Sequence, residues 1–318
     1  MRGGAPPSVV GQLPSGFESR LGAIDPTTLL LIAATLVVAL VLGWWARRRL
    51  RTPGTTLRRR LARRDSVTVL MHPNPDPDAM ACALGVAYLA DSVDTEATIQ
   101  YPGQVRHPEN RAFRTSLFPD DEDDAVLDGP DIELGKIERA DNLASETVVL
   151  VDHNDPRGFD GAERIEPYAV VDHHPGGGTG SSFTDVREDY GACASIVTEY
   201  FETLDAECVG PDETPDGDGV VLSANVATGL LYGILSDTQH LTKGCTDAEF
   251  AASKYLYPTV DEDDLYDIAN PPVDAEMLDV KATAITKRVV RPPFAISDVG
   301  TVSNVDAIPQ AADELLTL

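Results

Sequence analysis

Apolar runs of strand length alternate with longer apolar segments of helical length along this chain from Ser66 onward. Runs rich in Val, Ile and Leu predict strands at residues 66–72, 96–101, 147–151, 168–172 and 293–299. The longer segments predict helices at residues 79–90, 106–117, 191–204, 220–235, 246–256, 261–269 and 274–288. This alternation indicates an α/β fold, with a mostly parallel sheet that carries helices on both faces.

The first 64 residues follow another pattern. Leu29 to Trp45 is an uncharged apolar run, and residues 26–45 are long enough to form one transmembrane helix. An arginine-rich juxtamembrane linker, residues 46–64, follows at once and places the C-terminal side in the cytoplasm. A cleaved signal peptide would carry its positive charges before the apolar run, so we expect a retained single-pass anchor in the cell membrane. Residues 1–25, rich in Gly, Pro and Ser, are expected to be disordered.

Acidic residues dominate the rest of the chain. Residues 65–318 contain 14 basic and 50 acidic residues, and the acids are spread among apolar segments, including an expected loop at 119–133. High salt would screen the self-repulsion of such a surface, so we interpret the protein as halophilic rather than as an ordinary acidic protein. The acidity argues against a long duplex nucleic acid along a basic groove but allows a small phosphorylated ligand held through metal.

Four patches rich in His and Asp are the candidate chemistry of the chain. They are residues 72–78, Asp152-His153-Asn154, Asp172-His173-His174 and Ser236-Asp237-Thr238. Three of them follow predicted strands, and loops at the carboxyl ends of parallel strands converge on one crevice. A mixed set of imidazole and carboxylate ligands suits Mn²⁺, with Mg²⁺, Fe²⁺ or Co²⁺ as competitors. Taken alone, Asp78 would be no more than the N-cap of a helix from Ala79, but the four patches together predict a divalent metal site.

The same patches resemble the four motifs of the DHH phosphoesterase family, in the same order. The matching residues are His72-x-Asn74-Pro75-Asp76-x-Asp78-Ala79, Asp152-His153-Asn154, Asp172-His173-His174 and Gly233 to Thr238. Residues 185–200 resemble the stretch after the third motif in the RecJ-like, oligoribonuclease-like branch. The resemblance covers residues 66–310 and, with the acidic surface, indicates a haloarchaeal-type member with an N-terminal anchor.

The resemblance implies two Mn²⁺ ions, with Mg²⁺ or Co²⁺ as substitutes. The implied metal ligands are His72, Asp76, Asp78, Asp152, His173 and Asp237. Asp152 would bridge the two ions and take part in catalysis. His174 would be catalytic and would also bind the substrate. Asn154 would bind the substrate. The residues implied to orient the metal ligands without binding the metal are Asp172, Asn74 and His153.

Relatives in the family close the site with a smaller substrate-binding domain of the DHHA1 type. We expect the DHH phosphoesterase domain to span residues 66–305, and residues 306–318 to begin the helix between the two domains. The chain is therefore expected to lack the cap domain.

The expected function is metal-dependent hydrolysis of phosphodiester bonds in short oligonucleotides or small, including cyclic, nucleotides. The water that attacks the phosphate would be activated by the two ions. An inorganic pyrophosphatase is the alternative enzyme, and a non-catalytic membrane nucleotide sensor that retains the metal site is the alternative of another class. The exact substrate and the oligomeric state stay open.

Overall fold

The computed structural model describes residues 25–49, 52–105, 107–118, 132–217, 219–272, 275–303, 305 and 307–316. Nearly all of the expected disordered N-terminus and most of the expected acidic loop at 119–133 lie outside these residues. The chain divides into two units, residues 1–51 and 52–318. In the first unit, helix α2 (Pro26–Arg49) contains a segment, Pro26–Trp45, that is long and apolar enough to cross a membrane by length and composition.

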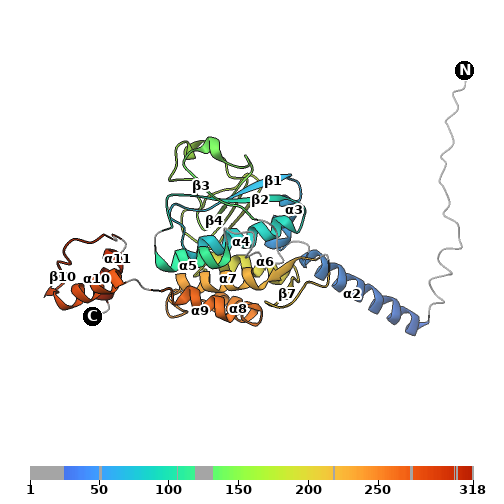
Figure 1. Cartoon of the computed structure of the whole chain (residues 1–318). Coiled ribbons are helices and arrows are strands. Elements are labelled where there is room, and N and C mark those ends of the chain that lie inside the picture. Colours follow the sequence, from blue (N-terminus) through green and yellow to red (C-terminus); the bar gives the residue numbers. More distant parts are fainter. Residues whose placement is uncertain are drawn as a thin grey trace, which may run out of the picture. The chain divides into compact units, whose positions relative to one another are not determined.

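The second unit is built on a six-stranded sheet in the order β3-β2-β1-β4-β5-β6, and all neighbouring strands are parallel (Figure 1). The strands are β1 (Ser66–Leu70), β2 (Glu96–Pro102), β3 (Leu134–Ile137), β4 (Val148–Val151), β5 (Ala169–Asp172) and β6 (Phe183–Val186). The order reverses between β1 and β4, and open sheets of this kind bind ligands beside such a reversal, at the carboxyl ends of the strands. The predicted α/β class is confirmed.

Side chains alternate across the sheet, and both faces are buried. Val69 and Val149 belong to the larger core, which lies against the main helices. Leu70 and Leu150 belong to a second, smaller core on the opposite face. Short 3₁₀ helices and their loops cover that second face, among them η2 (Ala140–Asn142) and η3 (Ala162–Arg164).

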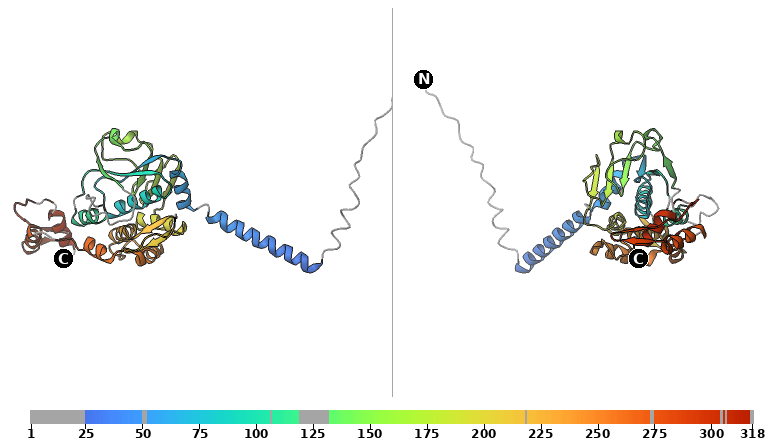
Figure 2. Two further views of the ribbon diagram at one scale, coloured as in Figure 1. Left: turned by 45° about the vertical axis from the view of Figure 1, so that its right-hand side comes forward. Right: turned by 90° about the vertical axis from the view of Figure 1, so that its left-hand side faces the viewer.

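The helices of the larger core pack on the sheet and then on one another (Figure 2). Helices α3 (Pro53–Leu61), α4 (Pro77–Asp91) and α6 (Cys193–Thr203) contact the sheet, and α5 (Pro108–Leu117) and α7 (Ala224–Asp237) pack on α4. Helices α8 (Asp247–Leu256) and α9 (Glu262–Ala269) pack on α7 from outside. Helix α4 is buried on all sides, as expected of a helix whose residues are apolar all round.

Some predicted elements differ from the observed ones. The segment predicted as a helix at 220–235 begins with a strand, β8 (Val221–Ser223), which pairs with β7 (Glu207–Val209), and α7 follows it. Ser223 then accepts a hydrogen bond from the Val226 N–H and begins the helix. Strands β3 and β6 were not predicted, and α3 lies inside the segment expected to be a linker.

The last part of the chain has a small core of its own. Helix α10 (Ala275–Thr286) packs on α11 (Ala307–Leu316) through Met277, Val280, Ala284, Ala307 and Ala311. Between them lies a hairpin of β9 (Val289–Arg291) and β10 (Phe294–Ile296), where a single strand at 293–299 was predicted. The domain boundary expected at residue 305 stays a prediction.

Candidate metal centre

The four His/Asp patches meet at the carboxyl edge of the sheet. His72 follows β1, Asp152 follows β4, His173 follows β5, and Asp237 ends helix α7. His72 Nε2 lies 3.4 Å from Asp76 Oδ2 and 3.3 Å from Asp152 Oδ2. The loops after β1 and β4 therefore join at the point where the strand order reverses.

A second group of side chains surrounds His173. Its Nε2 lies 3.3 Å from Asp152 Oδ1, 3.5 Å from Asp237 Oδ2 and 3.9 Å from Asp78 Oδ2. Asp152 thus points one carboxylate oxygen to each histidine and stands between the two groups. All six side chains implied as metal ligands lie in one cluster, and their role as ligands stays a prediction.

The two histidines of the cluster present the same ring nitrogen to it. His72 Nδ1 lies 3.0 Å from the carbonyl of Pro73, and His173 Nδ1 lies 3.1 Å from the carbonyl of Tyr190. A carbonyl only accepts hydrogen bonds, so each Nδ1 carries a proton and each Nε2 faces the carboxylates. Proteins commonly orient a metal-binding imidazole in this way, through a hydrogen bond from its other ring nitrogen.

The charge balance of the cluster fits a divalent cation. Burial and the neighbouring carboxylates of Asp152 and Asp237 raise the pKa of Asp78 well above its usual range. Burial, together with Asp76 and Asp152, raises the pKa of Asp237 to about 7. Burial and mutual repulsion thus oppose the ionisation of these carboxyl groups, and a bound cation would remove that repulsion.

The same carboxylates favour the charged form of the neighbouring histidine His72. Burial disfavours the charged form of His72, but the hydrogen-bonded carboxylates of Asp152 and Asp76 outweigh it and raise its pKa to about 11. Burial opposes ionisation of Asp152 too, yet His173 and His72 hold the pKa of that carboxyl well below its usual range. Among the described residues, Asp152 Oδ1 and His173 Nε2 are buried without a hydrogen-bond partner. Two buried atoms with free lone pairs, side by side, fit a cation between them.

Asp78 has a second role that the sequence did not reveal. Its oxygens accept hydrogen bonds from the backbone N–H groups of Cys193 (2.7 Å) and Ala194 (2.8 Å), at the first turn of α6. Ala192, the N-cap of that helix, provides no side-chain hydrogen bond, so Asp78 supplies the cap from a distant helix. The N-cap of α4 itself is Asp76, which corrects the alternative considered for Asp78.

The remaining predicted residues lie around the cluster. Asp172 Oδ1 accepts from His174 Nδ1 at 2.9 Å, and Asn154 Nδ2 lies 3.4 Å from the His174 carbonyl. His153 is buried, and burial outweighs its hydrogen bond to the Val151 carbonyl and lowers its pKa to about 4. Asn74 accepts from the Gln104 N–H at 3.0 Å, on the side of the β1 loop towards β2.

Arg187 is a further residue that sequence reasoning did not single out. It pairs with Asp185 (2.8 Å) and Glu199 (2.6 Å) and donates to the Tyr190 hydroxyl (2.8 Å). This network fixes the loop whose Tyr190 carbonyl holds His173. The signal in the sequence is the resemblance of residues 185–200 to the stretch after the third motif, which assigns no role to Arg187 by itself.

Residues 66–234 match the family model described as the DHH family, N-terminal domain. This chain belongs to the DHH family. The matched range begins at β1 and ends in α7, so it contains every patch of the cluster except Asp237.

Several relatives of this DHH-family chain are similar over most or half of its length. An uncharacterized protein of Methanocaldococcus jannaschii is 33% identical over 251 residues, which cover 79% of this chain and 47% of that protein. A protein of Lactococcus lactis subsp. lactis named "Probable manganese-dependent inorganic pyrophosphatase" is 28% identical to this chain. The similar region covers 56% of this chain and 52% of that protein. A protein of the same name from Streptococcus agalactiae is 30% identical over a region that covers 57% of this chain and 51% of that protein. The chain spans about half the length of these curated relatives.

Among solved structures, an exopolyphosphatase-related protein from Bacteroides fragilis is similar with a TM-score of 0.52. The two share 14% sequence identity over 73% of this chain and 64% of that chain. At this identity the likeness shows a common fold.

Proposed function

We propose that this DHH-family protein is a metal-dependent phosphoesterase that hydrolyses phosphodiester bonds of short oligonucleotides or small nucleotides. One observation carries the proposal: two imidazoles and four carboxylates from four separate segments are connected by imidazole–carboxylate distances of 3.3–3.9 Å at the switch point of the sheet. Two metal sites that share a carboxylate are a recurrent arrangement in enzymes that cleave phosphate esters.

The ligand set divides into two adjacent groups. His72, Asp76 and Asp152 form one, and Asp78, His173 and Asp237 form the other. We assign one Mn²⁺ to each group, with Asp152 between them, and the manganese in the names of two relatives supports that choice of ion. When bound, the ions would supply Lewis acidity at the phosphoryl group and a hydroxide near neutral pH.

His174 is the residue of the chain that we propose to act on the substrate. Its side chain is half-exposed at the edge of the cluster, and its Nδ1 is tied to the buried carboxylate of Asp172. This leaves Nε2 to hydrogen-bond a phosphate oxygen and to hold a proton for the leaving group. Asn154, which contacts the carbonyl of His174, would keep this loop in place next to the substrate.

We also propose that α2 anchors the protein in the cell membrane with the DHH domain in the cytoplasm. The large apolar side chains of α2 from Leu29 to Trp45 are exposed, and Arg47, Arg48 and Arg49 follow this apolar segment at the end of the helix. An apolar helix of this length with arginines at one end is typical of a span oriented with those arginines inside the cell.

An inorganic pyrophosphatase is the second candidate. It is favoured by the names of the Lactococcus and Streptococcus relatives, whereas residues 185–200 favour the oligoribonuclease-like branch. A membrane sensor that binds nucleotides without turnover is the third candidate, and the complete ligand cluster argues against it.

The test is hydrolysis by the detergent-solubilised full chain with Mn²⁺ and three substrates in parallel: a 5′-phosphorylated dinucleotide, a cyclic dinucleotide and pyrophosphate. We expect turnover of a nucleotide substrate. The rate should fall by more than about a hundredfold in Asp152→Ala, since mutating residues that only orient metal ligands already lowers metal affinity or activity by 10–100-fold. Asp155→Ala, an exposed residue of the same loop, is the matched control. Turnover of pyrophosphate alone would select the second candidate, and nucleotide binding without turnover the third.

A further inference from the structure

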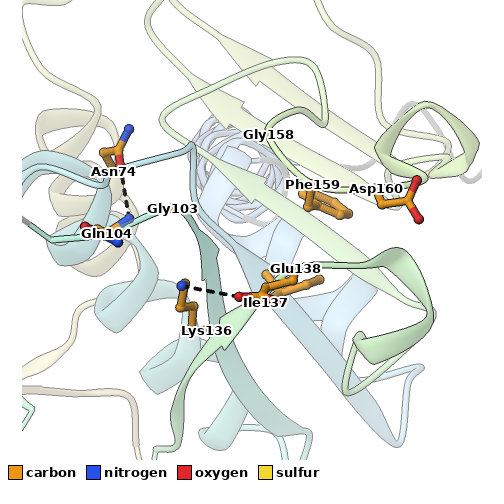
Figure 3. Close-up of a pocket in the computed structure, with 9 residues that line it drawn as sticks. All are labelled: Asn74, Gly103, Gln104, Lys136, Ile137, Glu138, Gly158, Phe159 and Asp160. Carbon is orange, nitrogen blue, oxygen red and sulfur yellow. Dashed lines mark hydrogen bonds and ion pairs between the residues drawn. The ribbon is translucent and has the colours of Figure 1, made fainter.

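A cavity of about 520 Å³ opens at the carboxyl ends of β1, β2 and β3 (Figure 3). Its volume is typical of sites for small organic ligands. Asn74, in its wall, lies between the predicted metal ligands His72 and Asp76 in the sequence. The cavity and the metal centre therefore share the loop after β1.

The loop after β4 provides the opposite side of the cavity. Figure 3 shows Asn74 and Gln104 on one side of the cavity and Phe159 with Asp160 on the other. This second loop packs on the first at Gly158, where an added Cβ would lie 2.2 Å from Pro73 Cγ. Gly158 also has a φ of +88°, which other residues adopt rarely, so both walls are held at a fixed separation.

The lining of the cavity opposes a bare polyanion. Lys136 provides a positive charge, but its Nζ lies 3.5 Å from Glu138 Oε1, and Asp160 adds a second carboxylate. Pyrophosphate or polyphosphate in this cavity would face more negative than positive side chains. The charge of the substrate thus belongs at the metal centre, and a neutral part of the substrate belongs here.

The same lining suits a planar, polar and uncharged group. Phe159 packs against the smaller core and exposes part of its ring to the cavity. A nucleobase stacks on such a ring whatever its sequence identity. Around the ring, the Lys136 ammonium can donate to base oxygen or nitrogen atoms, and the Glu138 and Asp160 carboxylates can accept from an amino group.

We propose that this cavity binds a nucleobase of the substrate while the adjoining phosphate lies at the metal centre. The proposal rests on the proposed function and deepens it, because it makes the substrate a nucleoside-containing phosphoester rather than an inorganic phosphate. Phe159 is the residue on which the base stacks.

The test compares initial rates of the full chain on two 5′-phosphorylated dinucleotides, one intact and one with abasic sites. The readout is the ratio of kcat/KM for the intact over the abasic substrate. Phe159→Ala should lower this ratio at least about fivefold, the lower end of what one base–aromatic stack contributes, and Phe159→Trp should restore it. Phe250→Ala removes an exposed aromatic residue from α8 and should leave the ratio unchanged.

Direct binding separates this proposal from the proposed function. Adenosine binding, measured by equilibrium dialysis in EDTA, should be weakened by Phe159→Ala and unaffected by Phe250→Ala. If nothing is hydrolysed but this pattern of binding is found, the phosphoesterase assignment falls and the base site stands. A ratio that Phe159→Ala leaves unchanged, or binding that it leaves unchanged, overturns the base site.

Discussion

Among the single residues of the site, Asp172 controls the position of His174. One oxygen of this buried carboxylate accepts hydrogen bonds from the His173 N–H (2.8 Å), the His174 N–H (3.1 Å) and His174 Nδ1 (2.9 Å). The hydrogen bond with Asp172 raises the pKa of His174, and burial opposes the rise. Asp172 therefore keeps His174 protonated to a higher pH than an isolated imidazole would be.

Replacing that carboxylate should move the pH dependence of the reaction. In Asp172→Asn the pKa of His174 falls, so the imidazole loses its proton at a lower pH. The alkaline limb of the pH–kcat profile therefore moves to lower pH. We expect kcat at neutral pH to fall about tenfold or more, while Mn²⁺ content measured by mass spectrometry is retained. An alkaline limb that stays at the wild-type pH would show that His174 does not act through Asp172.

The sequence identified the cluster residues because three of the four patches follow predicted strands and all four resemble motifs of the DHH family. It could not identify the groups that hold them. The cap that Asp78 gives to α6 joins residues 78 and 193, which no local pattern connects. The carbonyl that orients His173 belongs to the backbone of Tyr190, and a backbone group leaves no mark on the choice of side chain.

At the scale of elements, the site depends on how closely α7 approaches α4. A Cβ added at Gly233 would lie 3.1 Å from both Asp78 Cα and Asp78 Oδ1. Since the backbone of α4 cannot yield as a side-chain end can, Gly233 is required for Asp237 and Asp78 to reach the same histidine.

Gly233→Ala should therefore displace Asp78. We expect a loss of about 1–3 kcal/mol in the free energy of unfolding, as for other overpacked cores, and weaker Mn²⁺ binding by calorimetry. Gly229→Ala, one turn earlier on α7, is the control, because the added methyl meets the side-chain ends of Leu117 and Phe113 instead. Equal Mn²⁺ affinity in the two variants would contradict the assigned role of Gly233.

The start of α8 is joined to the loop of the site through Glu249. Its carboxylate accepts from the Gly191 N–H (2.9 Å) and the Thr246 N–H (2.7 Å). Burial opposes the charge of Glu249, but these hydrogen bonds outweigh it and lower its pKa. A carboxyl whose pKa is lower in the folded state stabilises the fold above its unfolded pKa and loses that contribution as the pH falls through the folded pKa.

Glu249→Gln should lower the free energy of unfolding by about 1.5 kcal/mol at pH 7, the value of a hydrogen bond to a charged acceptor. The difference from wild type should shrink as the pH falls through the lowered pKa of Glu249 and this carboxylate takes up a proton. Thermal melts across this range test the prediction, with the exposed Glu96→Gln as control. A difference that does not change with pH would mean that the charge of Glu249 contributes nothing.

Long, strongly apolar elements were predictable from the sequence, and short or exposed ones were not. Helix α4 and strands β1, β4 and β5 are continuous apolar segments and lie close to their predicted positions. Strand β6 follows the glycine-rich residues 176–180 and is buried on one side only, so its pattern is weak. Strand β8 adjoins α7 without a turn, and the two apolar segments were interpreted as one helix.

For the whole molecule, the two units carry opposite properties. The first unit contributes an apolar helix, and the second contains the buried cores of the fold. Removal of residues 1–49 should therefore move the protein from the membrane to the soluble fraction after ultracentrifugation and leave Mn²⁺ binding intact. Full-length protein in the soluble fraction, without detergent, would refute the proposed anchor.

If loops far apart in the chain form one centre for two divalent ions, calorimetric titration of the full chain with Mn²⁺ should detect both. We predict two bound ions per chain, loss of at least one in Asp152→Ala, and two in the control Asp155→Ala. No saturable binding to the wild-type protein, or an Asp152→Ala titration identical to that of the wild type, would contradict the account.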